Sequence, residues 1–146
     1  LNMQRCTVRN RVLKYTYGIE IKSEWKPGDP PQRRTADGRI NIFKRLAQRG
    51  MEVSADSKFG YELMPTSPDQ TEMKIDIYTT CEDTAKYCDD PGVKLLGVLS
   101  IKLPNANLGL ARSVNFSLMF GKMEIEAQAK DTLTGNTYET SFALSL

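Results

Sequence analysis

Apolar and polar side chains alternate with a period of two through most of the chain after residue 72. Such alternation is typical of strands with one buried and one solvated face, so it constrains this part of the chain to β-sheet. The Gly121-Lys122 step lies between two alternating series and predicts a β-hairpin. The positions expected to be buried are Met73-Ile75-Ile77, Val114-Phe116-Leu118-Phe120 and Met123-Ile125-Ala127-Ala129.

Further strands are expected over 95–103, over 138–144 and over 15–22, where Gly18 suggests a bulge or a close backbone approach. Proline, glycine and charged residues make 26–39 a long exposed loop. Residues 40–49 fit a short helix or a strand, and local pattern alone does not decide between them. The predicted fold class is all-β, an antiparallel β-sandwich of about eight strands.

The chain contains no histidine. Because His is the side chain that exchanges protons most readily near neutral pH, its absence excludes Ser-His-Asp and Cys-His catalysis and zinc sites built on His. Three cysteines without a Cys-x-x-Cys spacing predict no metal site. The paired carboxylates Glu124 and Glu126 share the solvated face of one strand, where an ordinary surface role is expected. We therefore expect no catalytic residue, no metal and no cofactor in this segment.

Cys6, Cys81 and Cys88 are an odd number, and the chain has no long apolar run or signal-peptide pattern. Both features favour a reduced, cytoplasmic setting without membrane contact. Cys81 and Cys88 flank one polar loop in which a disulfide is geometrically conceivable, and the sequence leaves their pairing open.

The net charge of +2 conceals two halves of opposite sign. Residues 1–50 carry twelve basic and four acidic side chains, a net of +8, and the remainder carry eight and fourteen, a net of −6. No nucleic-acid motif or row of exposed aromatics accompanies the basic half, so we expect no nucleic-acid partner. Residues 1–12 are interpreted as a basic linker and 13–146 as the β-sandwich domain. The charge is interpreted as a docking surface for an absent domain or an acidic client.

Three stretches in collinear order resemble the substrate-binding domain of the 70-kDa heat-shock chaperone family. The first is Tyr15-Thr-Tyr-Gly-Ile-Glu-Ile21, and the second runs from Pro65 to Tyr78 with its Asp-Gln step before an alternating strand. The third begins at Asp89-Asp-Pro-Gly-Val-Lys-Leu-Leu-Gly97 and continues through Ile125-Glu-Ala-Gln-Ala-Lys-Asp131 to the Thr134-Gly135 turn. The similarity is closest to the divergent twelve-type members, and it favours a strand over a helix for 40–49.

The resemblance implies a module that binds extended apolar peptide segments between two loop-bearing strands, without catalysis. An ATPase domain precedes this segment in the family and a helical lid usually follows it, and we expect neither in this chain. ATP and Mg²⁺ would then belong to the absent ATPase domain, which is an implied partner together with client peptides and co-chaperones. The residues implied in peptide binding are Ile19, Ile21, Leu63, Met73 and Ile75 on the pocket wall and Lys22 and Thr66 at the closing arch.

The chain departs from the family pattern at three places. Lys22 replaces a small or apolar arch residue and favours acidic flanks on a ligand, and Leu63 replaces an aromatic residue on the pocket floor. The basic run Arg9-Asn-Arg-Val-Leu-Lys14 replaces an acidic-capped leucine-rich linker, which puts ATP-regulated release in doubt. Two alternatives remain: Ile19 and Ile75 are plain core residues, or the domain is a protein-interaction scaffold that keeps the fold without a working groove.

Overall fold

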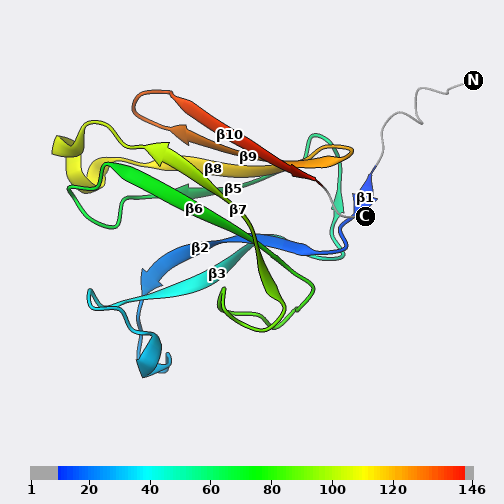
Figure 1. Ribbon diagram of the computed structural model, residues 1–146, viewed down its shortest axis with the longest axis horizontal. Coiled ribbons are helices and arrows are strands. Elements are labelled where there is room, and N and C mark those ends of the chain that lie inside the picture. Colours follow the sequence, from blue (N-terminus) through cyan, green and yellow to red (C-terminus); the bar gives the residue numbers. More distant parts are fainter. Residues whose placement is uncertain (1–9, 144–146) are drawn as a thin grey trace, which may run out of the picture.

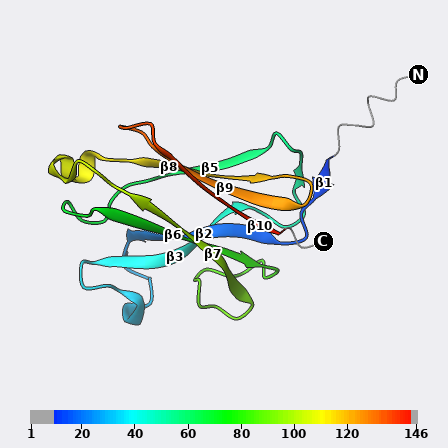
Figure 2. The ribbon, with the colours of Figure 1, turned by 45° about the horizontal axis from the view of Figure 1, so that its top comes forward.

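The computed structural model describes residues 10–143 and shows an antiparallel β-sandwich. Two four-stranded sheets, in the orders β10-β9-β8-β5 and β3-β2-β6-β7, lie over one another, and β1 pairs with β4 in a separate two-stranded ribbon (Figures 1 and 2). Eight strands therefore build the sandwich, as the sequence predicts. The strands are β1 Arg11–Val12, β2 Thr16–Glu24, β3 Arg39–Ala47, β4 Glu52–Val53, β5 Lys58–Leu63, β6 Glu72–Thr80, β7 Val93–Lys102, β8 Val114–Phe120, β9 Glu124–Asp131 and β10 Thr137–Ala143.

Residues 40–47 of the segment 40–49 belong to strand β3, which resolves the choice left by its local pattern in favour of a strand. Within the described residues, helical structure is confined to two short 3-10 turns, η2 (Pro31–Arg33) and η3 (Ala106–Ala111). The predicted loop 26–39 contains η2 and gives way to β3 at Arg39. Nowhere in 10–143 is there a helix long and apolar enough to cross a lipid bilayer.

Alternation along the strands produces one core between the two sheets. Near β1, the Tyr17 ring from β2 packs on the Phe120 ring from β8 with centroids 5.2 Å apart, and Phe59 meets Phe120 edge-on at 5.7 Å. The Tyr17–Phe120 contact joins the two sheets at one end of the sandwich, and the Phe59–Phe120 contact supports it from within one sheet. The largest fully buried aliphatic side chains are Ile19, Ile75, Ile77, Ile101, Leu103, Leu118 and Ile125.

The predicted alternation is wrong at Met123 and is not tested at Leu144. Met123 precedes β9 and is 71% exposed, so its predicted place on the buried face is wrong, because the hairpin turn extends one residue further than expected. Leu144, expected at the end of the last strand, lies outside the described residues, as do Cys6 and most of the basic linker.

Gly18 occupies an irregularity where β2 shifts its register against β3. A Cβ at this position would overlap the carbonyl oxygen of Lys44 and the ring of Phe43. Only glycine lets the two backbones approach this closely, so the predicted bulge with its close approach is confirmed.

Candidate functional site: a forked sheet and its groove

Strands β2 and β6 pair at one end and separate at the other. Their ladder covers only Thr16 to Ile19 opposite Thr80 to Ile77, whereas β2 continues beside β3 to Glu24 and β6 continues beside β7 to Glu72. Figure 1 shows β2 and β3 turning away from β6 and β7 past the crossing point. We call this opening in the sheet the fork.

Two bulges explain where the fork begins. The β2–β3 register shifts between Tyr17 and Gly18, and the β6–β7 register shifts between Ile77 and Tyr78. Gly18 and Tyr78 are partners across the β2–β6 ladder, so both irregularities lie at the same level of the sheet. The residues skipped by the two shifts are Leu46 of β3 and Leu96 of β7. Because a bulge bends its strand and increases the local twist, these two bulges turn the β2–β3 pair and the β6–β7 pair in different directions.

The fork leaves one backbone edge of each strand without a ladder partner among the described residues. These edges are residues 20–24 of β2 and 72–76 of β6. By contrast, the outer edge of β3 is partly covered, since the Phe43 N–H donates to the Lys86 carbonyl at 2.9 Å and the Arg45 guanidinium reaches the Ala85 carbonyl. Unpaired edges present backbone donors and acceptors suited to another extended chain.

A cavity of about 530 Å³ occupies the fork. Its size lies in the range typical of ligand pockets. Residues from β2, β3, β5 and β6 meet there with the β5–β6 loop and with η3. The lining residues are Glu20, Ile21, Lys22, Arg39, Asn41, Tyr61, Glu62, Leu63, Met64, Pro65, Thr66, Gln70, Met73, Lys74, Ile75 and Leu110.

Six of the seven residues implied in peptide binding line this one cavity. They are Ile21, Lys22, Leu63, Thr66, Met73 and Ile75. The seventh, Ile19, is fully buried, pairs with Ile77 at the closed end of the fork and belongs to the core rather than to the lining. Met73 and Ile75 serve both the core and the cavity wall, with 7% and 2% of their surfaces exposed.

Among the lining residues that sequence reasoning missed are four apolar ones: Tyr61, Met64, Pro65 and Leu110. Met64 and Leu110 are 57% and 52% exposed, which is unusual for large apolar side chains beside a cavity. The series Phe59, Tyr61 and Leu63 has the period-two spacing of a strand and is the signal that would have located Tyr61. No local pattern brings Leu110 to the same place, because it reaches the cavity from η3, far away in the sequence.

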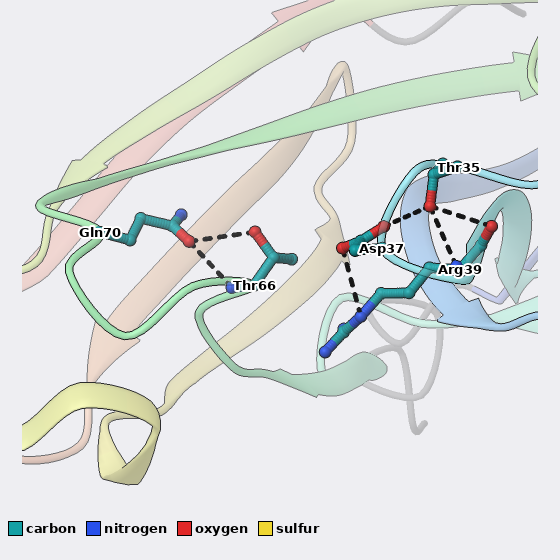
Figure 3. Close-up of polar contacts among 5 residues, drawn as sticks. All are labelled: Thr35, Asp37, Arg39, Thr66 and Gln70. Atoms are coloured by element: carbon teal, nitrogen blue, oxygen red, sulfur yellow. Dashed lines mark hydrogen bonds and ion pairs between the residues drawn. The ribbon is translucent and has the colours of Figure 1, made fainter.

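The β5–β6 loop forms one side of the groove and is held by its own hydrogen bonds. The Gln70 side-chain carbonyl accepts from the Thr66 N–H at 2.8 Å and from the Thr66 hydroxyl at 3.2 Å (Figure 3). The Gln70 amide then donates to the carbonyl of Glu72 at 2.7 Å. These contacts fix the predicted arch residue Thr66 relative to the start of β6.

The buried Arg112 side chain also holds the β5–β6 loop in place. Only 3% of its surface is exposed, and its guanidinium donates to the carbonyls of Gly109 at 2.8 Å, Leu103 at 3.1 Å and Pro68 at 3.2 Å, with a further short bond to Gln70. The planar fork of an arginine satisfies several acceptors at once. Arg112 thus connects the β5–β6 loop to the η3 turn, the two segments that supply Met64 and Leu110.

Residues of β2 and the start of β3 line the opposite side of the groove, and the β2–β3 loop holds Arg39 there (Figure 3). The Arg39 N–H donates to the Thr35 hydroxyl at 3.0 Å, and the Arg39 guanidinium lies 3.7 Å from the Asp37 carboxylate. The Thr35 hydroxyl also bonds to Asp37 and lowers the pKa of that carboxyl. Earlier in the loop, Arg33 pairs with Asp89 at 2.8 Å and lies 3.7 Å above the Tyr87 ring.

An acidic group lies at the closed end of the fork. Burial raises the pKa of the Glu20 carboxyl, and the neighbouring Asp76 carboxylate raises it further. The pKa of the Cys88 thiol is raised to about 12, mainly by burial and then by the negative charge of Glu20, so this thiol is protonated at neutral pH.

Cys81 and Cys88 are both free thiols, so the pairing that the sequence left open is not formed. Among residues 10–143, no group of acidic or cysteine side chains is arranged to hold a metal ion.

No protein-family model matches the chain. The chain is 28% identical over 147 residues to human heat shock 70 kDa protein 12B, an alignment that covers 92% of this chain and 21% of that protein. It is 25% identical over 138 residues to the human and mouse heat shock 70 kDa proteins 12A, covering 89% of this chain and 20% of each relative. The chain therefore spans about one fifth of the length of these relatives. This similarity, which extends along about nine tenths of an all-β chain, supports a relationship to the 70-kDa heat-shock protein family.

Proposed function

We propose that the chain is the substrate-binding domain of an atypical 70-kDa heat-shock-type chaperone and that its groove captures extended apolar peptide segments without catalysis. The observation that carries this proposal is the fork. It combines two unpaired backbone edges with a cavity of mixed polarity, whose apolar wall includes Ile21, Leu63, Met73 and Ile75, and in which six separately implied residues meet. Unpaired edges supply backbone hydrogen bonds to any extended chain, and the cavity supplies a place for one of its apolar side chains.

The exposed apolar side chains at the groove favour this function over that of a scaffold domain that has lost its peptide groove. A filled groove would be expected to bury its apolar residues, whereas Met64 and Leu110 remain more than half exposed beside an open cavity. The long β2–β3 loop, which could have covered the groove, instead packs on the 81–90 loop through Arg33 and Asp89. Exposed apolar surface of this kind is typical of interaction sites.

The proposal predicts that charges introduced at Met64 and Leu110 abolish most of the peptide affinity. In the double variant Met64→Asp/Leu110→Asp, we expect binding of a fluorescent, leucine-rich seven-residue peptide to weaken at least about thirtyfold, because two apolar contacts worth roughly 1 kcal/mol each are replaced by charges that must be desolvated. Fluorescence anisotropy measures this directly. Both positions are exposed, so the fold is expected to be unchanged.

Leu133→Asp is the matched control, since Leu133 is 56% exposed and lies in the β9–β10 turn outside the groove. We expect it to bind the peptide as the unaltered chain does. A dissociation constant weaker than about millimolar for the unaltered chain, or equal losses in the groove variant and the control, would favour the scaffold alternative.

A further inference from the structure

The two edges of the fork carry their charges in the same order. Ile19 pairs with Ile77 at the closed end, and this antiparallel register can be continued outward past the point of separation. The residues that then lie at the same level are, in order, Glu20 with Asp76, Ile21 with Ile75, Lys22 with Lys74, Ser23 with Met73, and Glu24 with Glu72.

Strand alternation divides these residues between two faces. Ile21 and Ile75 share the inner face with Met73 and pack against the core. The charged pairs share the outer face, with an acidic pair at the closed end, a basic pair at the next outer level and a second acidic pair at the mouth. The two isoleucines therefore lie between an acidic level and a basic level.

The acidic pair at the closed end has no cationic partner in its own ladders. Glu20 pairs with Phe43 on β3, and Asp76 pairs with Val98 on β7. Burial and then the charge of Asp76 raise the pKa of the Glu20 carboxyl, and the charge of Lys22 offsets only part of this rise. Glu20 lines the cavity, and neither carboxylate forms an ion pair with any described residue. A cation brought to this level would therefore be stabilised.

The basic pair lacks acidic partners in the same way. Lys22 pairs with Asn41 and Lys74 pairs with Ser100. Both lysines are exposed, line the cavity and take part in none of the ion pairs found within 10–143. This level is therefore suited to an anion.

The acidic pair at the mouth differs, because each of its members faces a cation in its own ladder. Glu24 pairs with Arg39, and Glu72 pairs with Lys102. Opposite charges across a ladder stabilise each other. Neither glutamate is among the residues that line the cavity. The two levels beside the isoleucines thus dominate the charge that a ligand meets in the groove.

From this order we infer that the groove selects segments whose apolar anchor lies between one basic and one acidic residue. This inference rests on the proposed function and specifies its ligand class. When the anchor of an extended chain enters the inner face beside the isoleucines, both of its neighbours point toward the outer face. The neighbour toward the closed end meets Glu20 and Asp76, and the neighbour toward the mouth meets Lys22 and Lys74. Two neighbours of like charge place one of them against its own sign.

Five capped, labelled seven-residue peptides with a central leucine test this inference by fluorescence anisotropy at low salt. The residues before and after the leucine are Lys and Glu, Glu and Lys, two Lys, two Glu, or two Gln. Both mixed orders are included, because a chain between the antiparallel strands β2 and β6 runs parallel to one of them in either direction. We expect the tighter mixed peptide to bind about fivefold more tightly than either like-charged peptide, which is the effect of one exposed ion pair. It should also bind more tightly than the Gln peptide, which has the same net charge.

Neutral variants assign each half of the preference to its pair. Glu20→Gln/Asp76→Asn should raise the affinity of the two-Glu peptide, relative to the others, to that of the tighter mixed peptide. Lys22→Gln/Lys74→Gln should do the same for the two-Lys peptide. In each variant one level no longer distinguishes the sign of the neighbouring residue, while the other level still does.

Glu124→Gln/Glu126→Gln is the matched control, since it removes two negative charges at exposed positions on β9 outside the groove and should leave the order of the peptides unchanged. The inference is overturned if a like-charged or Gln peptide binds the unaltered chain as tightly as the better mixed peptide. A control that changes the order, or a groove variant that preserves it, also overturns the inference and leaves peptide capture intact. Failure of all five peptides to bind at millimolar concentration overturns both the inference and the proposed function.

Discussion

Replacing Arg112 with methionine is expected to lower the free energy of unfolding by about 3 kcal/mol, because four carbonyls around this buried side chain lose their hydrogen-bond donor. The carbonyls of Pro68, Gln70, Leu103 and Gly109 all accept from this one guanidinium. A methionine fills similar volume but donates nothing. Urea denaturation followed by circular dichroism measures the loss. Peptide affinity should fall as well, since the β5–β6 loop is released from η3.

Two further variants separate the hydrogen-bond network from the mere removal of a positive charge. Arg112→Lys keeps the charge but has a single ammonium in place of the guanidinium fork, so we expect an intermediate loss. Arg34→Met removes an exposed arginine that stacks at 5.1 Å from Trp25 and should change stability by less than about 0.5 kcal/mol. A loss below about 1 kcal/mol for Arg112→Met would show that the carbonyls find other partners.

Gly18→Ala is the second change with a large expected effect. The added Cβ would overlap the Lys44 carbonyl oxygen and carbon and the Phe43 ring, so the β2–β3 ladder must move. Because two of these three nearest atoms belong to the backbone, no side-chain rotation relieves the overlap, and we expect a destabilisation of about 3 kcal/mol in thermal or urea unfolding. The displacement of β2 should also weaken peptide binding, since the bulge at Gly18 sets the start of the fork.

Gly60→Ala in β5 is the matched control, because its Cβ would lie 3.4 Å from the Phe116 carbonyl oxygen, a far less severe approach. We expect its stability to remain within about 1 kcal/mol of the unaltered chain, helped by the lower conformational entropy of an unfolded alanine. Equal stabilities for the two variants would contradict the close approach at Gly18.

The sheet-forming part of the chain could be predicted because its strands bury one face only. Residues 72–80, 114–120 and 124–131 obey the period-two rule almost without exception, so strand type and facing follow from local pattern. Residues 40–49 could not be assigned in this way. The strand structure of residues 40–47 depends on pairing with β2, a tertiary contact that no local propensity reports.

The candidate site was only partly predictable for a related physical reason. Alternation places Ile19 and Ile21 on the same face, but the bulges opposite Gly18 and Tyr78 leave Ile19 in the closed core and Ile21 in the open fork. Bulges change register without changing composition, so the sequence does not reveal where the β2–β6 ladder ends. Leu110 joins the groove through the Arg112 network, another long-range contact.

Hydrogen exchange measured by mass spectrometry, with and without the leucine-rich peptide, tests the fork most directly. The account predicts that peptide binding slows exchange at residues 20–24 of β2 and 72–76 of β6, the two edges left unpaired in the fork. The outer edges of β7 and β10 also end their sheets and serve as internal controls within the same experiment. New protection confined to β2 and β6 is the expected result. Protection at β7 or β10 with none at β2 and β6 would contradict peptide capture in the fork.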